Sequence, residues 1–387
     1  MNSETVSLAM GSKPRYEILD GLRGVAAMIV VAFHLFETYS PGPDYQILNH
    51  GYLTVDFFFV LSGFVLGYAY DDRWGRMTLA NFFKRRIIRL QPMLVMGTLI
   101  GAGFFYFGDA PQFSLVADTP VWKLAIIFLL ACVMFPTPPS MDIRGWQEMN
   151  SLNGASWSLS WEYIANILYA TVIRRLSRRA LGIFVGLSAL LTIDVAMNID
   201  TFGLLEVRSY AKYTVIGGFG LSPDQLYIGL CRLLYPFFAG LLVFRMNKLI
   251  AVRGGFWKCS AILAAVLVFP HVGGQTYPWM NGVYNATVIL LVFPLIVSMG
   301  AGSAITGARW IKACKFLGEI SYPLYITHYP LIYVQMDWVA RHPDSSTGAH
   351  IWVAVSLFLF AIAIAYSALR LYDLPVRDWL KRHWLKG

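Results

Sequence analysis

The chain has 387 residues, of which 57% are hydrophobic and 14% are charged, and its mean hydropathy is +0.55. Soluble domains carry about 25% charged residues, so this composition excludes an ordinary soluble protein and predicts an all-α bundle of transmembrane helices. The formal net charge is +9. We interpret this excess as a topology signal that also anchors the protein to anionic membrane lipids, with no nucleic acid as a partner.

Eleven apolar stretches are candidate membrane spans. The positions of the basic residues indicate which of them cross the membrane. Most of the 31 Lys and Arg fall on one side if the amino terminus is cytoplasmic and the stretch at 121–135 does not cross. This positive-inside bias predicts ten transmembrane helices, two cytoplasmic termini, and one re-entrant or interfacial helix near 121–135. The predicted spans are 18–39, 52–70, 90–107, 156–173, 180–197, 226–244, 256–270, 282–300, 316–338 and 351–372.

The spans leave no room for an appended soluble domain. We expect one membrane domain over 1–387, with a core of about 16–374 and a short basic cytoplasmic tail at 375–387. No secretory leader is evident, because the first apolar segment is too long and contains ionisable residues. No metal is expected, because the cysteines lack metal-ligand spacing and are predicted to pack in the core: Cys132, Cys231, Cys259 and Cys314.

Arg23 and His34 lie in the first predicted span, eleven residues apart. Eleven steps of about 100° place both side chains on one helix face, with heights that differ by about 16 Å. Ionisable groups at such depth cost about 2.5–3.5 kcal/mol or more, and they usually mark a reaction centre or an ion path. Arg23 could instead snorkel, or pair with Asp20, but its position on the His34 face favours a function.

A basic cluster precedes the third span in the segment NFFKRRIIRLQ, which contains Arg85, Arg86 and Arg89. Arg85 is four positions and Arg86 three positions before Arg89, so they share a helix face. Guanidinium groups suit phosphate oxygens, so the cluster could hold a phosphate ligand. The alternative is a positive-inside signal that binds lipid headgroups.

Two acidic residues are candidate partners of His34. Asp56 lies early in the second span, at a depth near that of His34, where a carboxylate would fix the imidazole tautomer; it could equally cap the helix. Glu162 lies about six residues into the fifth span, within SWSLSWEY. That depth favours a functional role over a surface charge.

Further polar residues could bind a substrate. His328 lies between Pro323 and Pro330, and such broken helices are tolerated where they line a cavity. Tyr325 falls near the same stripe, whereas Arg232 could either snorkel outwards or face an acceptor. No Walker loop, Ser-centred elbow or dinucleotide fingerprint is present, which argues against an ATPase, a hydrolase or a Rossmann enzyme.

Five segments together resemble acyltransferase family 3, whose members move acetyl or other short acyl groups onto sugars and related acceptors. They are ILDGLRGVAAMIVVAFHLF, VDFFFVLSGFVLGY, FFKRRIIRLQP, SWSLSWEY and GEISYPLYITHYP. The resemblance runs from about Tyr16 to Leu374 and implies a ten-span core with an acyl-CoA site open to the cytoplasm. Many relatives carry an extracytoplasmic hydrolase-like domain, which here would be a separate acyl-handling partner chain.

The resemblance also implies roles for single residues. Arg23 and His34 match the active-site Arg and His of the family, and Asp56 and Glu162 match its two acidic positions. Arg86 and Arg89, with the adjacent Arg85, match the family's basic pair before the third span.

These observations predict a membrane-bound O-acyltransferase of the bacterial inner membrane. Its donor would be acyl-CoA, most often acetyl-CoA, and its acceptor a glycan or lipid-linked sugar. His34 would act as general base or acyl relay, with Asp56 or Glu162 orienting it. Substrate contacts are expected from His328, Arg232, Trp157 and Tyr325. The alternative is a proton-coupled transporter of a small sugar or acid, since buried charges and broken helices also suit export.

Overall fold

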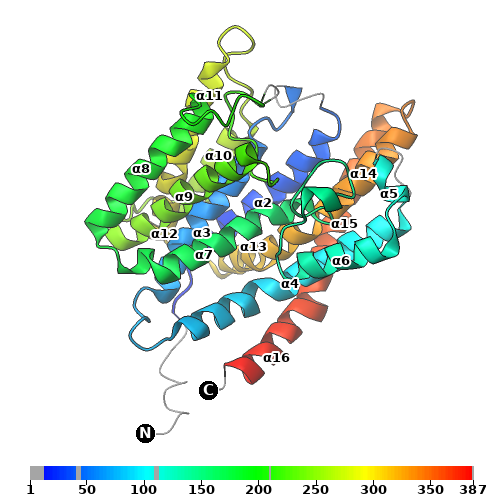
Figure 1. Ribbon diagram of the computed structural model, residues 1–387. Coiled ribbons are helices and arrows are strands. Elements are labelled where there is room, and N and C mark those ends of the chain that lie inside the picture. The colour runs from blue at the N-terminus through cyan, green and yellow to red at the C-terminus, as the bar shows by residue number, and fades with distance from the viewer. Residues whose placement is uncertain (1–12, 41–44, 109–112, 209–210, 386–387) are drawn as a thin grey trace.

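A computed structural model describes residues 13–40, 45–108, 113–208 and 211–385, and the regular structure within these ranges is helical (Figure 1). Seven helical segments are long and apolar enough to cross a membrane. The predicted all-α, polytopic bundle is therefore confirmed.

Five of these segments are single helices at predicted spans, although α4 begins eleven residues before the predicted start at 90. They are α2 (Glu17–Glu37), α3 (Thr54–Tyr70, after the turn η2, Gly51–Leu53), α4 (Leu79–Phe107), α8 (Arg178–Met197) and α9 (Pro223–Met246). The other two continue through a π-helical turn. They are α11–η6–α12 (Trp279–Thr287, Val288–Val292, Phe293–Gly302) and α15–η7–α16 (Thr347–Ala368, Leu369–Asp373, Leu374–Trp384).

The remaining three predicted spans are shorter or interrupted. Two are α7 (Trp157–Thr171), which continues into the turn η5 (Ile173–Arg175), and α10 (Gly255–Val268). The third is divided into α13 (Ala308–Thr327) and α14 (Tyr329–Arg341), which meet at His328. Pro330 stands at the start of α14, and because proline has no N–H it favours the first turn of a new helix there.

The segment near 121–135 forms a short helix. Helix α6 (Val121–Cys132) has 12 residues, follows the single turn α5 (Ser114–Ala117), and packs against α4. Twelve residues rise about 18 Å, whereas the hydrocarbon core of a bilayer is about 30 Å thick. Its length thus agrees with the predicted re-entrant or interfacial helix.

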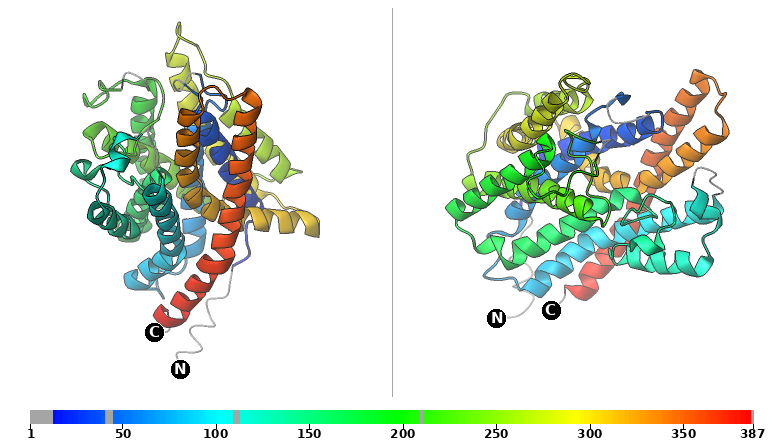
Figure 2. Two further views of the ribbon diagram at one scale, coloured as in Figure 1. Left: turned by 90° about the vertical axis from the view of Figure 1, so that its right-hand side faces the viewer. Right: turned by 45° about the horizontal axis from the view of Figure 1, so that its top comes forward.

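The described ends of the chain lie at one end of the bundle (Figures 1 and 2). The Lys13 ammonium pairs with Asp72 at 2.7 Å, and the Lys84 ammonium donates to the carbonyl of Trp384 at 3.4 Å. We call this end, where α3 and α9 finish and α4 and α8 begin, the basic end. The opposite end, which carries the long connections 133–156 and 198–222, is the loop end.

The core of the bundle is built on two close helix pairs, α3 with α9 and α2 with α13. On α3, a Cβ added at Gly63 would lie 1.7 Å from the Phe237 carbonyl oxygen. On α9, a Cβ added at Gly240 would lie 1.9 Å from the Val60 carbonyl oxygen. Small residues let membrane helices approach until their backbones touch, so these two glycines set the distance between α3 and α9.

We therefore expect Gly63→Ala and Gly240→Ala each to lower the melting temperature of the purified protein, because the added methyl group forces the two backbones apart. Gly103→Ala is the matched control, since nothing lies within 4 Å of a Cβ at that position in α4. It should leave stability unchanged or raise it through better helix propensity. Equal melting temperatures for all three variants would contradict this account of the α3–α9 contact.

At the loop end, the two long connections join each other. The Met149 N–H donates to the Phe219 carbonyl at 2.8 Å, and Glu148 and Gly220 form an isolated antiparallel bridge. This bridge buries the Glu148 carboxylate, which accepts a hydrogen bond from the Tyr333 hydroxyl of α14 at 2.9 Å. Desolvation raises the pKa of Glu148 to about 7, although the Tyr333 hydrogen bond and the nearby Arg144 guanidinium oppose the shift.

This raised pKa makes stability depend on pH. Between about pH 4.5 and pH 7 the folded protein keeps a Glu148 proton that the unfolded chain releases, so stability falls as the pH rises through this window and then levels off. Glu148→Gln should remove this contribution. We expect the melting temperature of the variant, relative to wild type, to increase between about pH 5 and about pH 8. A difference that does not change with pH would contradict the assignment.

Candidate functional site

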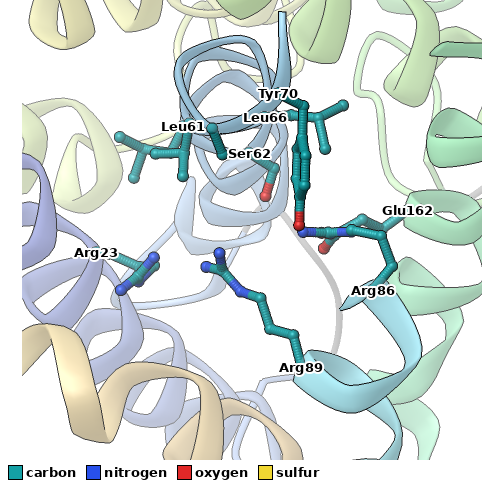
Figure 3. A pocket seen from close by; sticks show the side chains of 10 residues that line it. Arg23, Leu61, Ser62, Leu66, Tyr70, Arg86, Arg89 and Glu162 are labelled. Carbon is teal, nitrogen blue, oxygen red and sulfur yellow. The ribbon is translucent and has the colours of Figure 1, made fainter. Parts of the chain in front are cut away.

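A small cavity opens at the basic end between α2, α3, α4 and α7 (Figure 3). We call it the arginine cavity. Its volume is about 20 Å³, which is space for about one water molecule. It is lined by Arg23, Leu61, Ser62, Val65, Leu66, Ala69, Tyr70, Arg86, Arg89 and Glu162. The structure thus brings together four of the predicted site residues: Arg23, Arg86, Arg89 and Glu162.

Two of the three arginines have carboxylate partners. Arg86 of α4 donates to Glu162 of α7 at 2.6 Å, and both side chains are largely buried. Arg23 donates to Asp20 at 2.9 Å and also to the hydroxyl of Ser321 at 2.9 Å. These contacts tie α4 to α7 and α2 to α13, so they fix two walls of the cavity.

Arg89 is different, because its guanidinium has no carboxylate beside it. It points into the space between Arg23 and Arg86 (Figure 3) and makes no hydrogen bond or ion pair with any residue that the structure describes. An unpaired charge inside a bundle is costly. The arginine cavity therefore carries one positive charge in excess and is built to attract an anion.

Arg85, predicted to act with Arg86 and Arg89, does not line the cavity. Arg86 and Arg89 both line the cavity, whereas Arg85, although only about 40° from Arg89 around the helix axis, lies on the far side of Arg89 from Arg86. The structure therefore does not bring Arg85 into the cavity with Arg86 and Arg89.

His34 lies nearer the loop end, and its carboxylate partner is not one of the two predicted. Its Nδ1 lies 2.7 Å from the Glu37 carboxylate on the same helix. Asp56 and Glu162 are instead bound to Arg232 and Arg86, so the prediction that either one orients His34 is wrong. The pairing fails because a cation outcompetes an imidazole for a carboxylate that leaves water.

The His34 ring packs inside the protein. It stacks on His328 with ring centroids 5.4 Å apart, and the edge of Tyr329 meets it at 4.9 Å. The Nδ1 of His328 lies 2.8 Å from the Tyr325 carbonyl, which can only accept, so the proton sits on Nδ1. The buried Nε2 of His328 has no partner among the described residues. The imidazoles of His34 and His328 are therefore stacked at the break between α13 and α14.

The predicted substrate-binding residues are internal rather than cavity-lining. His328 is 0% exposed, which contradicts the prediction that the broken helix exposes it to a cavity. The Tyr325 hydroxyl contacts Ser158 at 2.8 Å, and Arg232 lies 5.0 Å from the ring of Trp157. The contact of these side chains with a substrate stays a prediction.

Arg232 and Asp56 form a buried pair that joins α9 to α3. Arg232 donates to the Asp56 carboxylate at 2.7 and 3.3 Å, and its remaining donors reach the carbonyls of Tyr52 and Gly217. With four of its five N–H donors bonded, Arg232 joins α9 to α3 through Asp56 and Tyr52.

Sequence reasoning missed Glu37, which stands three residues after His34 and so on the same helix face. That spacing was the available signal, but Glu37 ends the span and reads as an interfacial charge. It also missed the polar wall of the arginine cavity that Ser62 and Tyr70 provide on α3. Within the described residues, no group of three or more His, Cys, Asp or Glu side chains could hold a metal ion.

The arginine cavity does not reach His34, which is absent from its lining. The two centres sit on one face of α2, eleven residues and about 16 Å apart. A reaction that uses both needs a ligand long enough to span this distance.

Comparison with curated proteins gives relatives, two of which are named as acyltransferases. The chain is 24% identical over 372 residues to "O-acetyltransferase OatA" of Staphylococcus aureus, a match that covers 94% of this chain and 58% of that protein. It is 24% identical over 380 residues to "Acyltransferase MdmB" of Streptomyces mycarofaciens, covering 92% of this chain and 89% of that protein. "Protein 2 in picA locus" of Rhizobium radiobacter is 32% identical over 167 residues, which is 40% of this chain and 81% of that protein.

No solved structure matches the fold. The chain spans little more than half the length of the OatA protein. A sequence family described as an acyltransferase domain matches residues 16–370, which is nearly the whole chain. The resemblance carried by the five motifs is confirmed, and the chain is an integral membrane protein that belongs to acyltransferase family 3.

Proposed function

We propose that this protein transfers an acyl group, most simply acetyl, from acyl-CoA to a hydroxyl of a glycan or lipid-linked sugar. The observation that carries the proposal is the unpaired guanidinium of Arg89 in a cavity between helices of an acyltransferase. Coenzyme A is an anion with a long arm that ends in a thioester. It supplies both the charge that the cavity lacks and the length that separates Arg23 from His34.

The basic end would face the cytoplasm of a bacterium and take the donor there. Arg73, Arg76, Lys84 and Arg178 cluster at this end, as the positive-inside rule requires of a cytoplasmic face. Both termini would be cytoplasmic and the loop end extracytoplasmic. An acceptor sugar, or a separate acyl-handling protein, would then approach near Glu37 and His34.

Arg89 and Arg23 would attract the donor, while Glu162 holds Arg86 against the cavity wall. Guanidinium groups pair with phosphate oxygens through two parallel hydrogen bonds. With a volume of about 20 Å³, the cavity admits a donor only after side chains such as Arg89 and Tyr70 rotate. Phosphate binding would supply the free energy for that rotation by neutralising the unpaired charge.

His34 would act as the base. Its Nδ1 proton is donated to Glu37, which leaves a lone pair on Nε2. This nitrogen takes the proton of the acceptor hydroxyl while the hydroxyl oxygen bonds to the thioester carbonyl carbon. The carbon–sulfur bond then breaks, and the CoA thiolate takes up the proton. The bare Nε2 of His328 offers a further hydrogen-bond acceptor for the sugar.

Replacing Arg89 should change donor binding without lowering the stability of the fold. Arg89→Gln should weaken acetyl-CoA binding by about tenfold or more, because it removes a charge-assisted phosphate contact. Its melting temperature without donor should hold or rise, because an unpaired, partly buried charge is lost. Calorimetric titration and thermal unfolding of the purified protein measure both effects.

Arg85→Gln is the matched control, since it removes the same charge from the same helix outside the cavity lining. It should bind acetyl-CoA like wild type. If Arg89→Gln also binds like wild type, the arginine cavity is not the donor site.

Replacing His34 or Glu37 tests the base. His34→Ala should reduce acyl transfer about 10²–10⁴-fold while the protein still inserts and binds donor. Glu37→Leu should lose much of the activity, and Glu37→Gln, which keeps an oxygen acceptor for Nδ1, should recover part of it. Mass spectrometry of surface glycans, with radiolabelled acetyl transfer in membranes, gives the rates.

Asp337→Asn, which removes another carboxylate near the loop end, is the control and should retain activity. Full acylation by His34→Ala would remove this imidazole from the mechanism. Donor binding without any acyl transfer by wild type would instead favour a transporter.

A further inference from the structure

A second cavity with positive walls lies at the basic end and has no role in the function proposed above. It has a volume of about 610 Å³, which is within the usual range for small-molecule sites. We call it the basic groove. Its lining comes from the end of α3, the turn before α8 and the end of α9, and includes Asp71, Arg174, Ser177, Arg178, Phe244 and Arg245.

Asp71 and Arg245 neutralise each other in the wall of the groove. Arg245 donates to both oxygens of the Asp71 carboxylate, at 2.7 and 3.2 Å. Its Nη1 also donates to the carbonyl of Leu176 at 3.0 Å. This pair therefore fixes the groove and leaves no charge for a ligand.

Arg174 and Arg178 carry the charge that remains. The guanidinium of Arg174 lies 4.1 Å from the ring centroid of Trp74, and only its Nε is bonded, to the carbonyl of Ala170 at 2.6 Å. Arg178 is exposed and makes no hydrogen bond or ion pair with any described residue. Two guanidinium groups with free donors thus face one groove, which matches a phosphate group in charge and geometry.

The groove adjoins the arginine cavity. Tyr70 lines the arginine cavity and Asp71, the next residue, lines the groove, so the end of α3 separates the two. Coenzyme A carries phosphate in two places. Its diphosphate joins the pantetheine arm to the nucleotide, and its 3′-phosphate lies on the ribose, farther from the thioester. A donor whose arm enters the arginine cavity would leave this 3′-phosphate outside it.

The position of the groove favours a nucleotide over a membrane lipid. The helices α3 and α9, which contribute Asp71, Phe244 and Arg245, are the most buried of the candidate spans, at 72% and 67%. A groove at the ends of central helices opens to the aqueous side rather than to the acyl chains around the bundle. Phe244 adds apolar surface, which suits a purine ring.

We infer that the basic groove binds the adenosine 3′-phosphate end of the acyl-CoA donor through Arg174 and Arg178. The inference rests on the proposed function, since it assigns a subsite to the same donor. The two cavities would then bind different parts of the donor. The arginine cavity receives the arm, and the groove selects CoA over donors that lack the 3′-phosphate.

The test compares acetyl-CoA with acetyl-3′-dephospho-CoA by titration of the full-length protein in phosphatidylcholine nanodiscs. Wild type should bind acetyl-CoA about tenfold or more tightly than the dephospho form. In Arg174→Gln/Arg178→Gln, this preference should disappear. The double variant Arg175→Gln/Arg179→Gln is the matched control, because it removes the same charge from the same segment at exposed positions that do not line the groove.

Arg178→Gln alone guards against misfolding, since Arg178 has no partner to lose, and it should reduce the preference in the same direction. If wild type shows no preference, or the Arg174/Arg178 double variant keeps it, the inference is wrong while the proposed function stands. If neither donor binds wild type, the proposed function itself is wrong.

A lipid arm repeats the titration in nanodiscs that contain phosphatidylglycerol. Binding of this lipid that requires Arg174 and Arg178, without any donor preference, would assign the groove to a lipid phosphate and overturn the inference. Unchanged discrimination between the two donors in these nanodiscs would support it.

Discussion

The cost of placing a guanidinium inside a membrane protein governs this structure. Taking a charge out of water is expensive, so a carboxylate or a set of carbonyls must accompany it. The bundle follows this rule at four places, and three of the pairs join different helices or turns. The pairs are Arg23–Asp20, Arg86–Glu162, Arg232–Asp56 and Arg245–Asp71. The need to neutralise these arginines therefore also constrains how the helices pack, because each long-range pair holds two segments next to each other.

Arg89 departs from the rule, and the departure creates the candidate site. Its neighbours in the cavity are two arginines whose carboxylates are already engaged, so the cavity retains an excess positive charge. A protein tolerates this cost when an anionic ligand repays it on binding. In the proposed reaction, the donor phosphates would do so and would open the cavity as they bind. In the groove, by contrast, Arg174 and Arg178 lie at the aqueous edge, where a charge without a carboxylate partner costs little.

Helix α2 connects this anion site to the two imidazoles. Arg23 and His34 lie on one face of a single rigid helix that packs along α13, and the break after Thr327 turns His328 onto the His34 ring. Arg23 and the proposed base His34 are thereby held about 16 Å apart, too far for a small acyl phosphate but within reach of an extended pantetheine arm. Distance along α2 would thus contribute to donor selection.

The sequence by itself determined the elements and the family. Hydropathy located the helices, the length of 121–135 predicted a helix too short to cross, and helical periodicity placed Arg23 with His34 and Arg86 with Arg89. These properties depend on residues close together in the chain. Only the tertiary structure decided the partners. Asp56 pairs with Arg232 and Glu162 with Arg86, and the backbone of Glu148 forms a bridge with Gly220. Such contacts depend on which helix ends and loops become neighbours. Helical periodicity shows which residues share a face of one helix. The charge pairs instead join different helices, and their two residues are 76 to 176 positions apart in the sequence.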